Sequence, residues 1–220
     1  NYAFISEIQG IDINMAYLKK ARKIINDRRV TLNQASIYSL PYPRNYFDCI
    51  ILSEVLEHLE DEQRALQELK RVLKKNGIIL LTVPYENFPF FWDPLNWILM
   101  KVFHTHINKS IWWLAGMWAD HERLYTEDSL ENVIKTADLH ISKHKKYINR
   151  CWPFSHFILY GIGKNLVERL KIGAVDRFSM KKKTLAIVAA TVFRFPSRHE
   201  KNLSSRKPAV NLMMLLKKYT

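Results

Sequence analysis

Short apolar runs alternate with stretches of helical periodicity over the first 84 residues. A bounded apolar run of four to eight residues has the length of a strand. Four such runs predict strands: Ile8–Asp12, Val30–Ala35, Phe47–Leu52 and Ile78–Val83. Because the third run is apolar on both faces, we expect a parallel strand that is buried on both sides.

The stretches between these runs carry apolar residues three or four positions apart, which is the spacing of a helix with one buried face. Asn14 is placed to cap the first helix, and Glu62–Lys75 predicts a second that ends at Asn76-Gly77. Thr126 caps a third, followed by a strand at Leu139–Tyr147 and a closing strand at Val210–Leu216. This alternation of strands and helices predicts an α/β fold.

Composition supports one globular domain: 48% of the 220 residues are hydrophobic and 25% are charged. Two cysteines cannot form a disulfide framework, which favours a reducing, cytoplasmic setting. No apolar run approaches the roughly 18 residues of a membrane span.

The net charge of +13 is unevenly distributed. Residues 1–134 hold 15 basic and 17 acidic side chains, whereas residues 135–220 hold 19 and 4. Such a basic region favours a surface that faces phosphate, on lipid headgroups or nucleic acid. The alternative is an ordinary solvated basic face.

Polar residues follow three of the predicted strands. Asp12 ends the first, Ser36 follows the second, and Ser53 with Glu54 follows the third. Because ligands bind at the carboxyl ends of parallel strands, these side chains are candidates for a shared site. An acid in the position of Asp12 can accept hydrogen bonds from ribose hydroxyls, although capping the next helix is the simpler role.

Four segments together resemble the class I S-adenosylmethionine-dependent methyltransferases, in the group that includes ubiquinone-biosynthesis and small-molecule methyltransferases. They are GIDIN (10–14), SLPYPRNYFDCIILSEVLEHLED (39–61), LKRVLKKNGIILLTVP (69–84) and HERLYTEDSL (121–130). The resemblance implies a Rossmann-like sheet of parallel strands with a closing antiparallel hairpin, and S-adenosyl-L-methionine as cofactor. It implies cofactor-binding roles for six residues: Asp12 at the ribose with Ile13 beside it, Ser36 and Ile37 at the adenine, and Ser53 and Glu54 at the methionine part.

The sequence departs from this family in two ways. Many relatives have an aspartate where Ser36 stands. The family's glycine-rich loop and the strand before it, which should precede Gly10, are absent, and that strand would lie between the strands ending at Asp12 and Leu52. We therefore expect the C-terminal portion of a longer protein, which alone folds poorly and binds cofactor weakly. A degenerate member without activity is the rival explanation.

We expect four regions: a partial cofactor-binding core (1–84), an aromatic acceptor lid (85–118), the C-terminal part of the core (119–150) and a basic C-terminal region (151–220). The lid contains Trp92, Trp97, Trp112, Trp113 and Trp118, beside Lys101, His104 and Lys109. Tryptophans next to basic residues are typical of an interfacial segment, and Cys151–Leu170 is a second candidate. The alternative is that the rings pack onto the sheet or fold over a small aromatic substrate.

His58 and His121 are the candidate catalytic bases for a hydroxyl acceptor. His121 and Arg123 can instead simply fix the loop before Thr126. Glu54, Glu57 and His58 have the spacing to hold a divalent ion, as in some quinone-type relatives, but acids at a helix start are also stabilised by its dipole, and we expect no metal.

The functional hypothesis is methyl transfer to a small-molecule or lipid-linked acceptor, with an anionic membrane surface as partner. An inactive scaffold and an RNA-binding methyltransferase are the alternatives, and nucleic acid is the less favoured partner because no dedicated RNA module is present.

Overall fold

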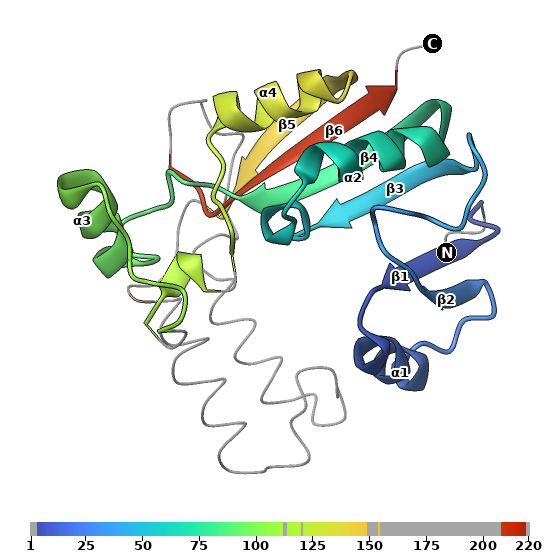
Figure 1. The fold of residues 1–220 in the computed structure, drawn as a ribbon, viewed down its shortest axis with the longest axis horizontal. Helices are drawn as coiled ribbons and strands as arrows, with labels where there is room; N and C mark the ends of the chain where they lie inside the picture. The colour runs from blue at the N-terminus through green and yellow to red at the C-terminus, as the bar shows by residue number, and fades with distance from the viewer. Residues whose placement is uncertain (1–3, 112–113, 120, 149–153, 155–207, 219–220) are drawn as a thin grey trace.

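The computed structural model describes residues 4–111, 114–119, 121–148, 154 and 208–218, which form an α/β fold (Figure 1). The strands are β1 (Ile8–Asp12), β2 (Val30–Gln34), β3 (Phe47–Ser53), β4 (Leu73–Pro84), β5 (Leu139–Tyr147) and β6 (Asn211–Lys218). The helices are α1 (Met15–Ile24), α2 (Glu62–Val72), α3 (Pro94–Phe103) and α4 (Glu127–Thr136), with short 3₁₀ turns η1 (Leu56–His58) and η2 (Gly116–Trp118).

The strands form two sheets. β1 and β2 pair in parallel, and the second sheet has the order β3-β4-β6-β5. β3 and β4 are parallel, whereas β6 lies antiparallel between β4 and β5. The predicted closing strand and its antiparallel arrangement are therefore confirmed, at Asn211–Lys218 instead of Val210–Leu216.

The predicted burial of the third strand on both faces is wrong. Cys49 is exposed, and Ile51 in the middle of β3 is 69% exposed. Among the described residues β3 pairs only with β4, and β1 does not pair with it. One face of β3 therefore packs on the core through Leu52, while the other remains open to solvent.

The second helix is shorter than predicted. It ends at Val72, and Leu73 already belongs to β4, where it pairs with Phe47. Leu73 is fully buried, so extending the helix would remove it from the core. Asn76-Gly77, expected as a helix end, lies within β4, with Asn76 at a positive φ of 64°.

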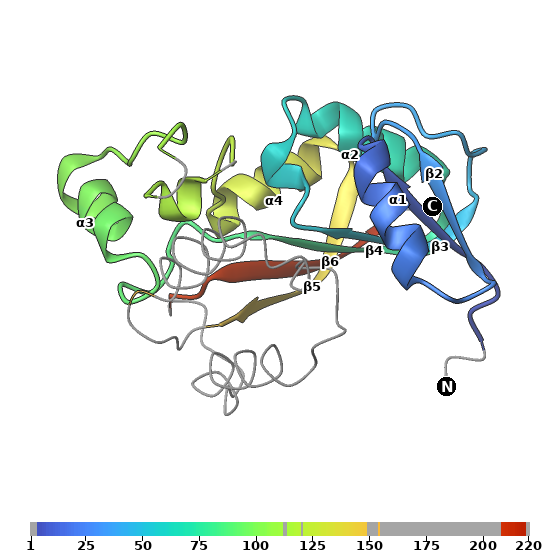
Figure 2. The same ribbon diagram turned by 90° about the horizontal axis from the view of Figure 1, so that it is seen from below.

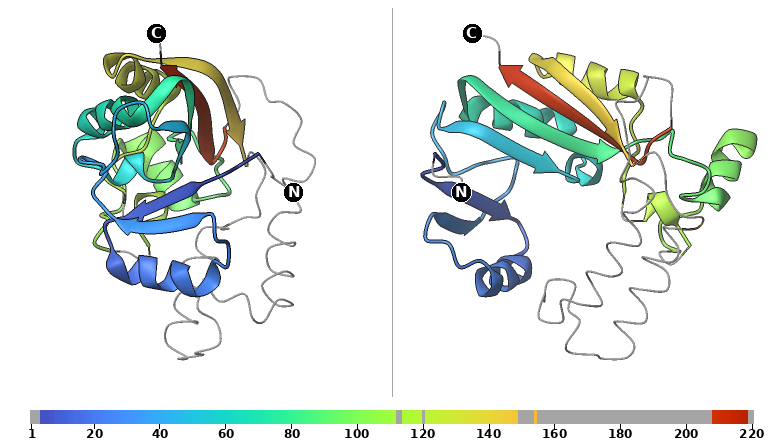
Figure 3. Two further views of the ribbon diagram at one scale, coloured as in Figure 1. Left: turned by 90° about the vertical axis from the view of Figure 1, so that its right-hand side faces the viewer. Right: turned by 180° about the vertical axis from the view of Figure 1, so that it is seen from behind.

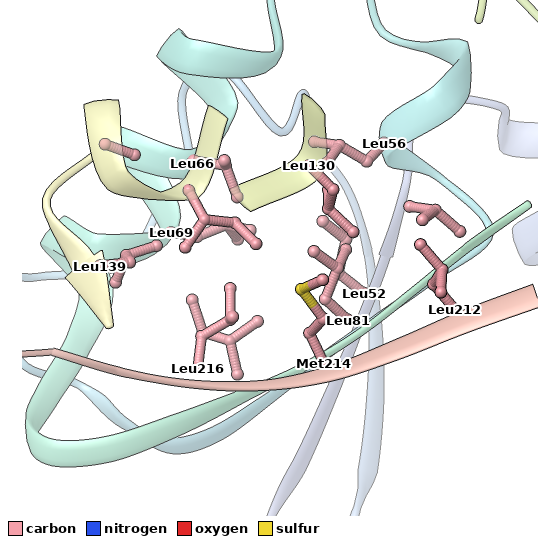
Figure 4. Close-up of a cluster of buried hydrophobic side chains, with 14 of the residues drawn as sticks. Leu52, Leu56, Leu66, Leu69, Leu81, Leu130, Leu139, Leu212, Met214 and Leu216 are labelled. Atoms are coloured by element: carbon pink, nitrogen blue, oxygen red, sulfur yellow. The ribbon is translucent and has the colours of Figure 1, made fainter. Parts of the chain in front are cut away.

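The main core lies between the four-stranded sheet and the helices α2 and α4. Figure 2 shows both helices on the same face of that sheet. Figure 4 shows Leu66, Leu69 and Leu130 from the helices facing Leu81 and Met214 from the strands. This packing fixes the ends of β3 and β4, where the candidate site lies.

A second, smaller cluster holds the lid segment that follows β4. Its buried residues are Phe88, Met117, Leu124 and Val210, and Trp92, Trp97 and Trp118 pack against it half-buried. These three tryptophans pack against this cluster while staying partly exposed, and the interfacial interpretation of the segment stays a prediction. Trp112, Trp113, most of Cys151–Leu170 and the basic run Lys181–Lys183 lie outside the described residues.

Within the part of the chain that the structure describes, every helix is too short or too polar to cross a membrane.

Candidate functional site

The first group of predicted cofactor residues lies at the ends of β1 and β2. One carboxylate oxygen of Asp12 accepts the backbone amide of Asn14 at 2.7 Å, but the residue that caps α1 is Asn14 and not Asp12. The carbonyl of Asp12 accepts the amide of Ala35 at 3.3 Å, which brings the chain just before Ser36 beside the end of β1. The side chain of Ile13 is 71% exposed, so it is accessible to a ligand.

Ser36 and Ile37 form a tight turn after β2. The Ser36 hydroxyl accepts the backbone amide of Tyr38 at 3.3 Å, and Ile37 packs against the main core. Since the Ser36 hydroxyl is engaged within its own turn, it has less hydrogen-bonding capacity left for a ligand.

The second group lies at the ends of β3 and β4 and forms a connected hydrogen-bond chain. The hydroxyls of Ser53 and Thr82 lie 2.8 Å apart, and that of Thr82 donates to one carboxylate oxygen of Glu54 at 2.7 Å. The side-chain amide of Asn211 donates to the other at 2.8 Å. Burial raises the pKa of Glu54, whereas these two hydrogen bonds and His58 favour its charged form. Thr82 and Asn211 were not predicted, since only the pairing of β4 with β3 and β6 brings them here.

Glu54 also has an unusual backbone, with φ of 53°. A left-handed conformation at a non-glycine residue costs about 1 to 2 kcal/mol, so the surrounding structure must hold it. The bonds from Thr82 and Asn211 do so, and they direct the Glu54 carboxylate toward β4 and β6.

β1 and β3 point toward the same side of the molecule (Figures 1 and 3). The two groups of polar residues therefore both follow the carboxyl ends of strands on that side. This is the arrangement expected for a nucleotide cofactor at a parallel sheet. The roles of Asp12, Ile13, Ser36, Ile37, Ser53 and Glu54 at a cofactor stay predictions.

The two candidate bases come together around a buried carboxylate. The imidazole rings of His58 and His121 have centroids 4.9 Å apart. Nε2 of His58 lies 3.7 Å and Nε2 of His121 lies 4.0 Å from the same oxygen of Glu57. Glu57 is fully buried, and neither of its carboxylate oxygens has a hydrogen-bond partner among the described residues. Burial raises its pKa to about 8, with a further contribution from the negative charge of Glu54.

Two contacts explain why residues 63 positions apart meet here. The amide of Glu122 donates to the carbonyl of Glu57 at 3.0 Å, and the guanidinium of Arg123 donates to the carbonyl of Leu59 at 2.5 Å. Arg123 also forms an ion pair with Glu62 at 3.0 Å. Arg123 therefore fixes the loop before Thr126, which was the alternative to a functional role. His121 lies beside Glu57 and His58.

Part of the chain matches known methyltransferases in sequence. Residues 1–81 match a family model described as a methyltransferase domain. The ubiquinone/menaquinone biosynthesis C-methyltransferase UbiE of Serratia proteamaculans is 42% identical over 74 residues, which is 32% of this chain and 30% of that protein. UbiE of Yersinia enterocolitica is 37% identical over 79 residues, 34% of this chain and 32% of that protein. The match thus spans about a third of these relatives.

Solved structures extend the likeness in fold over nearly the whole chain. An S-adenosylmethionine-dependent methyltransferase from Mesorhizobium loti superposes with a TM-score of 0.53 at 16% identity, covering 97% of this chain and 81% of that one. The [4+2]-cyclase SpnF gives 0.53 at 19% identity, covering 97% and 67%. The resemblance to the methyltransferase group is confirmed: residues 1–81 match a methyltransferase-domain model, and the fold is the Rossmann-like fold of solved class I methyltransferases.

Proposed function

We propose that this chain forms part of an enzyme that transfers a methyl group from S-adenosyl-L-methionine to a small-molecule or lipid-linked acceptor. The observation that carries the proposal is the methyltransferase-domain match, on a fold whose parallel strands β1 and β3 end in Asp12 and Ser53. Asp12 binds the ribose with Ile13 beside it, Ser36 and Ile37 flank the adenine, and Ser53 with Glu54 faces the methionine part.

The protein's task in this reaction is mainly to hold and desolvate the reactants. The acceptor attacks the methyl carbon, the bond from sulfur to that carbon breaks, and S-adenosylhomocysteine leaves. An acceptor that carries a proton on the attacking atom transfers it to the imidazole of His58 or His121, which lie side by side. The UbiE relatives are named as C-methyltransferases of ubiquinone and menaquinone biosynthesis, which supports a quinone-type acceptor that is methylated on carbon.

Cofactor binding is tested by titrating S-adenosyl-L-methionine calorimetrically into the complete polypeptide that carries this sequence. Asp12→Ala should weaken binding by about tenfold or more, because a hydrogen bond to a charged group contributes about 1.5 to 3 kcal/mol. Asp48→Ala is the matched control, since Asp48 is an exposed acid at the other end of the sheet and pairs with Lys74. No binding by the unsubstituted polypeptide would favour the inactive scaffold.

The proposal includes an anionic membrane surface as a partner. The supporting observation is the surface of α3, which only the structure gives. One side of α3 is apolar yet exposed, with Leu95, Ile98, Val102 and Phe103 at 40 to 65% exposure. Residues at this spacing form one stripe, and the exposed Lys101 lies on the same helix. A short amphipathic helix with basic neighbours suits the lipid headgroup region.

Membrane binding is tested by flotation with vesicles of phosphatidylglycerol and phosphatidylcholine. Val102→Glu with Phe103→Glu should abolish flotation, whereas Ile24→Glu should not, although Ile24 on α1 is also an exposed apolar side chain. Flotation that is indifferent to the α3 pair rejects this surface. A gel shift with RNA that falls steeply with salt, without flotation, would favour the nucleic-acid alternative instead.

A further inference from the structure

The two groups of predicted cofactor residues lie on different sheets. Asp12 ends β1 of the two-stranded sheet, and Ser53 ends β3 of the four-stranded sheet. Within the described part of the chain no ladder of backbone hydrogen bonds joins β1 to β3 (Figure 3). A ligand that touches both groups therefore depends on side-chain contacts that hold one sheet against the other.

The segment between β2 and β3 is fixed by its backbone to the four-stranded sheet and its helices. Arg71 on α2 donates to the carbonyls of Leu40 and Tyr42 at 3.0 and 2.8 Å. The amide of Tyr46 donates to the carbonyl of Val72, at the end of α2, at 2.7 Å. Since α2 packs on the four-stranded sheet through the main core, this segment belongs to that sheet.

The side chain of Tyr42, in contrast, contacts the two-stranded sheet. Its hydroxyl donates to the side-chain carbonyl of Gln9 on β1 at 3.2 Å and accepts the side-chain amide of Asn33 on β2 at 3.4 Å. Asn33 also donates to Gln9 at 3.0 Å, so the three side chains form a closed hydrogen-bonded ring. The aromatic ring of Tyr42 stacks on Tyr46 and lies edge-on to Phe47. Tyr42 therefore joins the two sheets.

Tyr38 makes a second link, near the carboxyl ends of the strands. It follows the turn of Ser36 and Ile37, and its hydroxyl accepts the amide of Asp61, the N-cap residue of α2, at 3.3 Å. The guanidinium of Arg64 lies over the ring of Tyr38, 5.3 Å from its centroid. The turn that is predicted to flank the adenine is thereby tied to the start of α2.

We propose that Tyr38 and Tyr42 are positioning residues, which set the separation between the adenosine end and the methionine end of the cofactor site. This inference rests on the proposed function, and it assigns both hydroxyls a role that acts through other residues. Contacts at one end of a ligand strengthen binding at the other end only where the spacing of the two ends is right. A displacement of about 1 Å can cost a factor of about 100 in rate, so the link between the sheets matters for catalysis.

The test uses Tyr38→Phe with Tyr42→Phe, which removes both hydroxyls and keeps both rings. The complete polypeptide is titrated calorimetrically with S-adenosylhomocysteine, which has both the adenosine and the amino-acid part, and with 5′-methylthioadenosine, which lacks the amino-acid part. We expect the double variant to bind S-adenosylhomocysteine about tenfold more weakly and 5′-methylthioadenosine within about twofold of the unsubstituted polypeptide. Only the longer ligand needs both sheets at the right separation.

Tyr85→Phe is the matched control. The hydroxyl of Tyr85 accepts Nζ of Lys146 at 3.1 Å and donates to Glu127 at 3.4 Å, and both partners belong to the four-stranded sheet and its helices. Its loss removes two hydrogen bonds without touching the link between the sheets. A general loss of stability, recorded by thermal unfolding, should therefore leave the ratio of the two affinities unchanged in this variant.

A second measurement needs no ligand. Spin labels on Lys23→Cys in α1 and Gln67→Cys in α2, both exposed positions, report the distance between the two parts by pulsed electron resonance. Cys49 and Cys151 are replaced by serine so that each label has one place to attach. We expect the double tyrosine variant to have a wider distance distribution than the parent, and Tyr85→Phe to match the parent.

The proposal is overturned if the double variant keeps the parent's distance distribution. It is equally overturned if both ligands lose affinity by the same factor, or if S-adenosylhomocysteine loses none. An unsubstituted polypeptide that binds neither ligand rejects the proposed function, and with it the role of the two tyrosines at the cofactor. The label distances separate these cases, because they report the link between the sheets whether or not the cofactor binds.

Discussion

The buried carboxylate of Asp93 accepts the backbone amide of Met117 at 2.9 Å, and so joins the start of α3 to η2 across 24 residues. The same oxygen accepts the side-chain amide of Asn96 at 2.8 Å. Asn96 in turn donates to the carbonyl of Ala115 at 2.9 Å and accepts the amide of Ile107 at 2.9 Å. This network, more than the tryptophans, gives the segment after β4 a defined shape.

The first prediction concerns Gly116, which lies against this network with φ of 59°. A Cβ there would lie 1.8 Å from Oδ2 of Asp93, so Gly116→Ala combines a left-handed backbone with a clash. We expect a loss of about 2 kcal/mol or more, because positive φ alone costs about 1 to 2 kcal/mol. Thermal unfolding measures it, with Ser110→Ala as an exposed control in the same segment; equal melting temperatures for the two variants would contradict the network.

The second prediction tests the cap of α4. The Thr126 hydroxyl accepts the amide of Ser129 at 3.0 Å, and the Ser129 hydroxyl accepts the amide of Thr126 at 2.9 Å. Thr126→Ala should destabilise the chain by about 1 kcal/mol, the usual cost of losing an N-cap oxygen. Thr126→Ser retains that oxygen and should unfold in urea close to the unsubstituted chain. A loss of equal size in both would show that packing of the methyl group, and not the cap, is responsible.

The third prediction is a pH dependence at Glu68. Its carboxylate binds Arg71 through two hydrogen bonds of 2.7 Å and accepts the amide of Leu40 at 2.7 Å. The hydrogen bonds from Arg71, more than any other contact, lower the pKa of Glu68. A lowered folded-state pKa means that the stabilisation is complete above the unfolded pKa of about 4.3 and is lost as the pH falls through the folded value.

Glu68→Gln should therefore destabilise the chain at pH 7 and make less difference as the pH falls below about 4. Urea unfolding of both proteins at pH 7, 4 and 3 measures the change. Lys135→Gln, which removes an exposed helix-surface pair with Glu131, is the control and should have little effect at any of these values. A difference between Glu68→Gln and the parent that stays constant with pH would argue against the ion pair.

The fourth prediction compares two isoleucines on paired strands. Ile79 on β4 is fully buried, whereas Ile51 on β3 is 69% exposed. Ile79→Ala should cost about 2 to 5 kcal/mol, because a buried side chain leaves a cavity. Ile51→Ala should stay within about 0.5 kcal/mol, as is usual for an exposed position. Comparable losses in urea unfolding of the chain of residues 1–220 would mean that Ile51 is covered.

The sequence alone determined the elements and their order. Apolar runs of strand length and helical stripes predicted the α/β alternation, and the caps at Asn14 and Thr126 lie where local hydrogen bonding alone places them. The resemblance carried by the segments around Gly10 and Ser53 gave the fold family. These are local properties, readable from neighbouring residues.

Tertiary structure decided the rest, because it depends on which distant segments meet. The apolar pattern of β3 predicts burial, but it does not tell which strands lie beside β3. Ile51 is therefore exposed, contrary to the prediction. The sequence spacing grouped Glu54 with Glu57 and His58, yet the pairing of β4 with β6 brings Thr82 and Asn211 to Glu54. The backbone hydrogen bond from the amide of Glu122 to the carbonyl of Glu57 brings His121 beside Glu57 and His58. This is a long-range contact that local sequence does not predict.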